Sequence, residues 1–315
     1  MITDQLKFND EAISRLAVLA NNLEEGRSSH WQFYLKDFSF NDGNFSGMKG
    51  FGGNRKYNFS INFVHHLMQK PYYRWGQKNL IQEICKSGKA IAKKQGRCFD
   101  LDQLRQALTL AFLMEKISLN ELSGNICIIG DGFANLTNML LSCLPSNKIT
   151  KIICVNLTPV LAVDIACILK ANKGVSLALV ENADQMQLAL RDKKVSVIAL
   201  QADNCELLSG SPIGLAANIA SFQEMNPEII DQYFRILRAS KIINPYIYCC
   251  NRVEKMLPDG TVTRFFDYPW RSDDEIIVDE LCPWQQKYYK CMPPAYYLYD
   301  GPAQHRLARL ANGSN

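Results

Sequence analysis

The sequence lacks several features that mark particular classes of protein. Its 35 Lys and Arg nearly balance 31 Asp and Glu, so the net charge is only +4 over 315 residues, and the basic residues are scattered. Proteins that bind nucleic acids usually gather basic residues on one element, so we expect no nucleic-acid partner. No run approaches the roughly 18 consecutive apolar residues of a membrane span, so we expect no membrane partner either.

Histidine and paired cysteine are also scarce. There are four histidines and no Cys-x-x-Cys pair, which leaves little material for a zinc site, and we expect no metal. The 11 cysteines are odd in number and irregular in spacing, and several lie in apolar runs. The first residues, MITDQLKFNDE, do not resemble a secretory signal. These features favour free thiols in a reducing, cytoplasmic compartment.

The first third of the chain has helical patterns. Residues 1 to about 30 and 61 to 120 carry apolar side chains at three- and four-residue spacing, with Asp100 and Asp102 at the start of the last segment. Strand-like runs are missing here, so we expect a helical amino-terminal cap domain over residues 1–120. The glycine-rich segment 40–54 within it reads as a surface loop or lid rather than a phosphate cradle, because no strand precedes it.

From about residue 125 strand-like and helical runs alternate. The apolar runs lie at 125–130, 151–157, 175–180, 195–200, 213–220 and 244–250. This alternation predicts an α/β fold, a Rossmann-like doubly wound and mostly parallel sheet, over residues 121–315. The run at 175–180 is one strand more than the standard order needs, and its place stays open. After residue 257 we expect a hairpin turning at Asp259-Gly260 and an aromatic-rich carboxy-terminal extension of antiparallel strands.

A glycine loop follows the first predicted strand. Gly130, Asp131 and Gly132 lie between this strand and a helix, where a ligand can approach the backbone closely. The dinucleotide fingerprint needs a third glycine, but Asn135 stands at that position. The loop therefore favours S-adenosylmethionine, whose methionine part it would contact, over NAD.

The next two strands end in polar residues. Asn156 and Leu157 follow the second strand, where both cofactor classes usually have an acid for the ribose hydroxyls; an amide can bond a hydroxyl without charge assistance. Asn156 can also belong to a helix-capping turn. Ala202 and Asp203 follow a later strand, where Asp203 is either an acceptor for the adenine amine or a solvated loop acid.

The run at 213–220 delivers further candidates to the same edge. We expect Asn218 and Ser221 near the cofactor and Glu224 as a general base; the alternative for Glu224 is a cap for the helix that begins near Pro227. His66 and His305 are further candidates for the base. A buried structural role is the alternative for the helical pair His65 and His66.

Several stretches together resemble one family. They are the strand-glycine loop, NLTPVLAVDIACIL, the Asn-x-x-Ser-Phe-Gln-Glu-Met run at 218–225, DYPW at 267–270, CPWQQKYY at 282–289 and HRL at 305–307. Over roughly residues 60 to 310 the chain resembles the bacterial sugar O-methyltransferases. It departs from them at Asn156, where the family has Asp, and at Gln285-Gln286, where the family has Trp-His.

The resemblance implies an S-adenosylmethionine-dependent O-methyltransferase that methylates a hydroxyl of a sugar or sugar-like metabolite. The expected partner is this small-molecule acceptor, and a homodimer stays open. Two rival functions remain: a binding or scaffold protein with a decayed methyltransferase fold, and an NAD-dependent enzyme acting on a nucleotide sugar.

Overall fold

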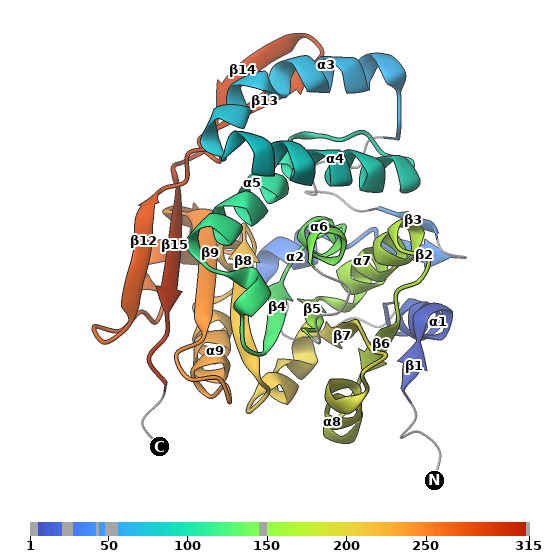
Figure 1. The fold of residues 1–315 in the computed structure, drawn as a ribbon, viewed down its shortest axis with the longest axis vertical. Coiled ribbons are helices and arrows are strands. Elements are labelled where there is room, and N and C mark those ends of the chain that lie inside the picture. The colour runs from blue at the N-terminus through green and yellow to red at the C-terminus, as the bar shows by residue number, and fades with distance from the viewer. Residues whose placement is uncertain (1–5, 21–27, 42–43, 48–55, 145–149, 313–315) are drawn as a thin grey trace.

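A nine-stranded sheet forms the centre of the molecule (Figure 1). The structure is a computed structural model that describes residues 6–20, 28–41, 44–47, 56–144 and 150–312. Five strands run parallel in the order β7-β5-β4-β8-β9. Their bounds are Val197–Gln201, Ile152–Asn156, Asn125–Ile129, Ile213–Ile219 and Tyr246–Arg252. This is the 3-2-1-4-5 order of doubly wound folds and confirms the predicted fold class.

Further strands extend both edges of the sheet. The extra strand β6 (Leu177–Val180) pairs in parallel with the outer side of β7, and β1 (Lys7–Phe8) pairs antiparallel with β6. At the opposite edge β15 (Ala303–Arg309) runs antiparallel to β9, and β12 (Glu275–Leu281) runs antiparallel to β15. The run at 175–180 therefore lengthens the sheet without changing the order of its centre.

Helices cover both faces of the sheet, as the doubly wound pattern requires. The helices α1, α4, α5, α6 and α7 pack on one face and α8 and α9 on the other (Figure 1). Their bounds are Asn9–Ala20, Lys78–Lys94, Leu101–Lys116, Asn135–Cys143, Thr158–Ala171, Ala183–Arg191 and Pro227–Arg238. Successive residues of the parallel strands face opposite sides, so Ile126 and Ile128 enter one core while Cys127 and Ile129 enter the other.

The amino-terminal helices share their core with the sheet. Leu16 of α1 and Leu104 of α5 belong to the same buried cluster as Ile128 of β4, so no gap in the core separates residues before and after 120 among those described. The expectation that the first third has no strands is wrong. It contains β1 and the hairpin of β2 (Ser39–Asn41) and β3 (Asn44–Ser46), strands too short to show an alternating pattern.

Two local predictions about the remaining segments are confirmed. Asp100 caps α5 in a capping box with Gln103. The predicted turn at Asp259-Gly260 joins β10 (Glu254–Met256) to β11 (Val262–Arg264). The other elements, in which η denotes a 3-10 helix, are α2 (Ser29–Tyr34), α3 (Phe59–Gln69), η1 (Lys70–Trp75), η2 (Leu119–Glu121), η3 (Ala202–Leu208), η4 (Phe222–Glu224), η5 (Phe265–Asp267), β13 (Lys287–Cys291) and β14 (Pro294–Leu298).

Two predictions meet the limits of the described residues. Most of the glycine-rich segment 40–54 lies outside them, so its loop or lid role stays a prediction. Among the helices that are described, none combines the length and apolar character of a membrane span.

Candidate functional site

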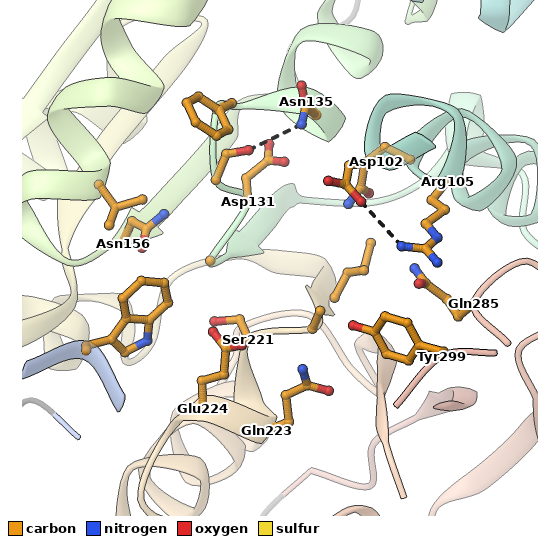
Figure 2. A pocket seen from close by; sticks show the side chains of 18 residues that line it. Asp102, Arg105, Asp131, Asn135, Asn156, Ser221, Gln223, Glu224, Gln285 and Tyr299 are labelled. Atoms are coloured by element: carbon orange, nitrogen blue, oxygen red, sulfur yellow. Dashed lines mark hydrogen bonds and ion pairs between the residues drawn. The ribbon is translucent and has the colours of Figure 1, made fainter. Parts of the chain in front are cut away.

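Two adjoining cavities lie at the carboxyl ends of the parallel strands, and Figure 2 shows the residues that line the first of them. The first has a volume of about 200 Å³ and the second of about 290 Å³, and both are lined by Trp31, Gly130, Asn156 and Ser221. Doubly wound sheets bind their ligands at this edge. We refer to the two cavities together as the cleft.

The glycine loop of the cleft has an unusual backbone. Gly130, Gly132, Phe133 and Ala134 have φ values of +75°, +57°, +60° and +48°. A residue with a side chain costs on the order of 1 kcal/mol in this left-handed region, so Phe133 and Ala134 need support from their surroundings. The close approach of Ser221 requires the glycine at 130, where a Cβ would lie 2.1 Å from the Ser221 Oγ.

The carboxyl groups of two aspartates give that support. Asp131 accepts hydrogen bonds from the backbone N–H groups of Leu136 and Thr137, at 2.9 and 2.8 Å, and so fixes the start of α6. Asp164 of α7 accepts the N–H of Ala134 at 2.9 Å. Asp131 thus lines the cleft, but its carboxylate is engaged in holding the loop.

Asn156 is held by the same buried acid. Its Nδ2 donates to the Oδ2 of Asp164 at 2.8 Å, and its Oδ1 accepts the N–H of Leu157 at 3.0 Å. Burial, and after it the nearby charge of Asp131, raises the pKa of Asp164 to about 8. The end of β5 therefore has the amide of Asn156 where an acid was expected, and the nearest acid is Asp164, which is buried behind it. A lone acid inside the apolar run TPVLAVDIACIL is the signal that sequence reasoning missed.

The second cavity is the more apolar part of the cleft. Leu157, Ala202 and Asp203, which were predicted near the cofactor, line it together with Ile229 and Tyr233 of α9. An apolar slot with a carboxylate in its wall suits a flat heteroaromatic ring that carries an amine.

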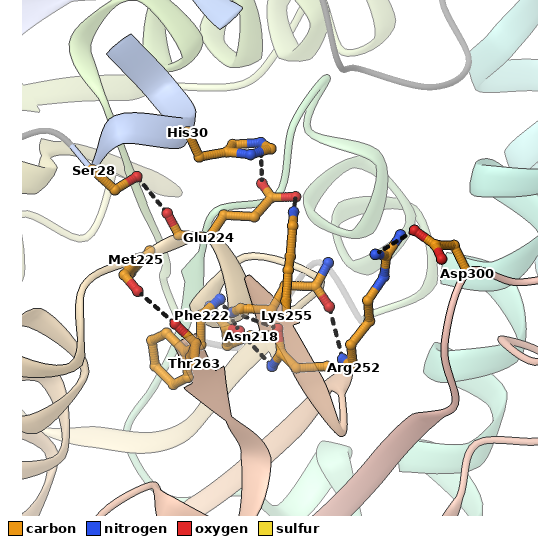
Figure 3. A network of polar contacts seen from close by, with 12 residues as sticks. Ser28, His30, Asn218, Phe222, Glu224, Met225, Arg252, Lys255, Thr263 and Asp300 are labelled. Atoms are coloured by element: carbon orange, nitrogen blue, oxygen red, sulfur yellow. Dashed lines mark hydrogen bonds and ion pairs between the residues drawn. The ribbon is translucent and has the colours of Figure 1, made fainter. Parts of the chain in front are cut away.

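Glu224 lines the first cavity and belongs to a charged group of side chains (Figure 3). Its Oε1 lies 2.7 Å from the Nζ of Lys255, and its Oε2 lies 3.5 Å from the Nε2 of His30. Burial raises the pKa of Glu224, while Lys255 opposes this shift. Burial and the charges of Lys255 and Arg252 lower the pKa of His30 to about 4, so the imidazole is neutral at pH 7.

The helix α2 is attached over the cleft through three consecutive residues. Ser28 Oγ donates to the carbonyl of Glu224, Ser29 Oγ accepts the N–H of Asp259, and His30 contacts the Glu224 carboxylate. These contacts place Trp31 in the wall of both cavities. No local pattern in the sequence indicates this, because the contacts join segments about 200 residues apart.

Asn218, expected near the cofactor, lies behind the cleft. It is 1% exposed, its Oδ1 accepts the N–H of Phe222 at 2.9 Å, and its Nδ2 donates to the carbonyl of Ile129 at 3.0 Å. It therefore holds the turn between β8 and η4. Asn218 is the last but one residue of β8, so its side chain is still within the strand and does not extend beyond its carboxyl end.

The two histidines proposed as bases lie outside the cleft. His66 is exposed on α3. His305 is 1% exposed in β15, where its Nδ1 lies 3.1 Å from the Tyr248 hydroxyl and its ring packs edge-on against Trp284. The alternation of the strand turns His305 into the core, so the structure gives it a packing role.

Gln285 and Gln286 stand where the resembled family has Trp-His, and only the first of them lies in the cleft. Gln285 lines the first cavity, whereas Gln286 donates to the backbone carbonyls of Cys282 and Ala303. Sequence reasoning missed Asp102, Arg105 and Tyr299, which also line the first cavity. Among the described residues no cluster of three His, Cys, Asp or Glu side chains is arranged to hold a metal ion.

Comparisons with known proteins give similarity at the level of solved structures. No family model matches the chain, and no curated protein matches it. The O-methyltransferase TomG from Streptomyces achromogenes is 12% identical, with 72% of this chain and 89% of that chain covered and a TM-score of 0.34.

Two further solved structures are similar to the same degree. An S-adenosylmethionine-dependent methyltransferase from Mesorhizobium loti is 12% identical, with 63% and 96% covered and a TM-score of 0.38. The mitomycin 7-O-methyltransferase MmcR is 10% identical, with 80% and 72% covered and a TM-score of 0.35. At these values the fold assignment rests on the strand order of the chain itself.

Proposed function

We propose that this protein is an S-adenosylmethionine-dependent methyltransferase whose donor lies across the carboxyl ends of β4, β5 and β7. The observation that carries the proposal is the pair of cavities that meet at Gly130, Asn156 and Ser221 on this edge. The donor supplies an electrophilic methyl group on a sulfonium. The protein supplies the binding site, the orientation of the acceptor and a base.

The side chains of the second cavity fit the adenosine part. Leu157, Ile229 and Tyr233 offer apolar surface for the adenine ring, and Asp203 offers an acceptor for its amine. Asn156 lies at the end of β5 for the ribose. The glycine loop, in the wall of both cavities, is then beside the methionine part.

The start of α6 favours this donor over NAD. A dinucleotide places its pyrophosphate on free N–H groups at the helix N-terminus. Here the carboxylate of Asp131 already accepts the N–H groups of Leu136 and Thr137. A pyrophosphate would compete with an acid for the same donors.

The cleft also favours an active site over a decayed one. The left-handed backbone at Phe133 and Ala134 and the burial of Asp164 all cost stability. Phe133 lines the first cavity, and Asp164 holds Ala134 next to it, so these costs lie at the place where a ligand would bind.

In this proposal Glu224 takes the proton from a hydroxyl of the acceptor. It lines the polar first cavity beside Ser221 and Gln223, and Lys255 holds its carboxylate in place. The acceptor is a sugar or sugar-like metabolite, supported by the likeness of residues 218–225 and 282–289 to the sugar O-methyltransferases.

Calorimetric titration tests the donor site. We expect S-adenosylmethionine and S-adenosylhomocysteine to bind and NADH not to bind. Asp203→Ala should weaken binding of S-adenosylhomocysteine about tenfold, whereas Asp267→Ala, at an exposed position of η5, should leave it unchanged. A wild-type protein that binds neither sulfur compound would exclude the proposal and favour the scaffold.

A further inference from the structure

A third cavity continues the cleft away from the donor site. It has a volume of about 510 Å³ and shares Asp102, Arg105 and Tyr299 with the first cavity. Its other walls come from α3, from the β13–β14 hairpin and from Arg252 at the end of β9. An acceptor with a hydroxyl beside Glu224 can therefore extend into this space.

Arg252 has hydrogen-bond donors that the protein leaves unused. Its Nη1 lies 3.1 Å from Asp300, whose side chain is 93% exposed, and an ion pair with so exposed a partner contributes little. Its Nη2 has no hydrogen-bond partner among the residues that the structure describes. Its Nε also has none there, but that atom is buried too deeply for a ligand in the cavity to reach. A buried donor in that state costs about 1–3 kcal/mol.

Arg238 shows what a structural arginine looks like in the same protein. Its two Nη atoms bind both carboxylate oxygens of Asp274, at 2.6 and 2.8 Å, and also the carbonyls of Pro269 and Ala311. Arg252 has no such set among the described residues. An anion in the third cavity would supply partners for its two Nη atoms, because two oxygens of a carboxylate or phosphate match the guanidinium fork.

The neighbouring arginine is already engaged. Arg105 binds the carbonyls of Trp284 and Lys287 at 3.2 and 2.8 Å and the carboxylate of Asp102 at 3.3 Å. Both guanidinium groups approach the ring of Tyr299, that of Arg105 at 5.3 Å and that of Arg252 at 4.8 Å from the ring centre. Tyr299 thus lies between an arginine with bound partners and one with donors to spare.

Arg252 is also close to the proposed reaction centre. Its backbone N–H donates to the Oε1 of Gln223 at 2.7 Å, and Gln223 lines the first cavity next to Glu224. The charge of Arg252 opposes the rise that burial causes in the pKa of Glu224, and it contributes to the lowered pKa of His30. A single small molecule can therefore place an anionic group on Arg252 and a hydroxyl group beside Glu224.

We infer that the acceptor is an anionic sugar and that Arg252 determines this specificity by binding its carboxylate or phosphate group in the third cavity, beside Tyr299, which lines both this cavity and the first. The inference rests on the proposed function, because it takes the first cavity as the place where the acceptor hydroxyl reacts.

Titration of the protein with three matched sugars tests the inference. Glucuronate, glucose 6-phosphate and glucose are added to the protein with and without S-adenosylhomocysteine, and binding is followed by calorimetry. We expect at least one anionic sugar to bind about tenfold or more tightly than glucose. The better of the two identifies the group as carboxylate or phosphate.

Variants then locate the effect. Arg252→Gln should reduce the affinity for the anionic sugar to that for glucose, and Arg252→Lys should give an intermediate value; both should keep the affinity for S-adenosylhomocysteine. Arg264→Gln, which removes an exposed ion pair with Glu254, should change neither affinity. A melting curve checks that each variant is folded.

Each contrary outcome is distinct. Equal binding of the three sugars to the wild type, no binding of either anionic sugar, or a preference that survives in Arg252→Gln would overturn the inference. If Arg252→Gln does not fold, the affinities of the wild type for the three sugars and the intermediate affinity expected of Arg252→Lys still test the inference. Failure to bind S-adenosylhomocysteine would overturn the proposed donor site instead, and the sugar preference could still be measured without it.

Discussion

At the scale of single residues, Gly130 is the position where a small change should have the largest effect. Gly130→Ala places a Cβ 2.1 Å from Ser221 Oγ in a backbone with φ of +75°. We expect a loss of about 2–3 kcal/mol in the free energy of unfolding and at least a tenfold loss of S-adenosylhomocysteine affinity. Urea denaturation and calorimetry measure the two effects.

The chain offers a matched control for this variant. Gly260 has φ of +88°, but a Cβ there would have nothing within 4 Å. Gly260→Ala should therefore cost only the backbone strain of about 1 kcal/mol and leave ligand affinity unchanged. Equal effects of the two alanines would mean that contact with Ser221 has no importance.

Glu224 is the residue on which the proposed chemistry depends. Glu224→Gln keeps the shape and removes the basicity, so it should lower kcat on the order of a hundredfold, with S-adenosylhomocysteine affinity preserved. The assay follows methyl transfer to whichever of the three sugars binds most tightly. Glu206→Gln, at an exposed position of η3, is the control. Normal turnover with an early melting transition would make Glu224 a structural residue.

His30 should make stability depend on pH. Its pKa is about 4 in the folded protein and near 6.5 when unfolded, so between these values the unfolded chain binds more protons. Stability should therefore fall as the pH falls from 6.5 to 4, by at most about 1.4 kcal/mol per pH unit from this residue.

Comparison with His30→Gln isolates that contribution. The difference in unfolding free energy between wild type and variant should change across pH 4 to 6.5 and be constant above it. His66→Gln, at an exposed position, should show a much smaller change. A difference that does not vary with pH would contradict the neutral, buried imidazole.

How far the sequence predicts individual site residues depends on the range of the contact that positions them. Gly130, Asn156, Asp203 and Ser221 line the cleft because each lies at the end of a strand or within two residues after it, which a local pattern reveals. The Glu224 ion pair with Lys255 and its contact with His30 join distant segments, and no local pattern reports them. His305 shows the opposite error, since a strand near the site can turn a candidate base into the core.

At the scale of elements, α2 is the least expected part of the site. Trp31 lines both cavities, and Phe33 of the same helix is 53% exposed. Trp31→Ala should reduce S-adenosylhomocysteine affinity about tenfold with little change in the melting temperature, and Phe33→Ala should do neither. Calorimetry that finds the same affinity in both variants would remove α2 from the binding site.

The strands show why some elements can be predicted and others cannot. Buried parallel strands such as β4 and β5 are continuous apolar runs that the sequence reveals directly. The place of β6 depends on pairing with β7, and β1 is only two residues long and exists because β6 offers a free edge. The residues of a short segment do not indicate with which strand it will pair.

At the scale of the whole molecule, the core that runs from α1 and α5 into the sheet predicts a single unfolding unit. Tryptophan fluorescence and far-ultraviolet circular dichroism should follow one coincident transition in urea. Two separated transitions, with part of the helical signal lost first, would instead support an independent domain over residues 1–120.

The position of β15 between β9 and β12 has a consequence for biosynthesis. Residues 303–309 leave the ribosome after all the other strands that the structure describes, yet they form an inner strand of the sheet. Until they emerge, β12 has no neighbour and the edge of β9 is open to other nascent chains. A premature stop codon in place of Ala303 would delete β15 and leave β12 without a strand to pair with, so the sheet would lose both. We expect the truncated product to aggregate or to be degraded in cells.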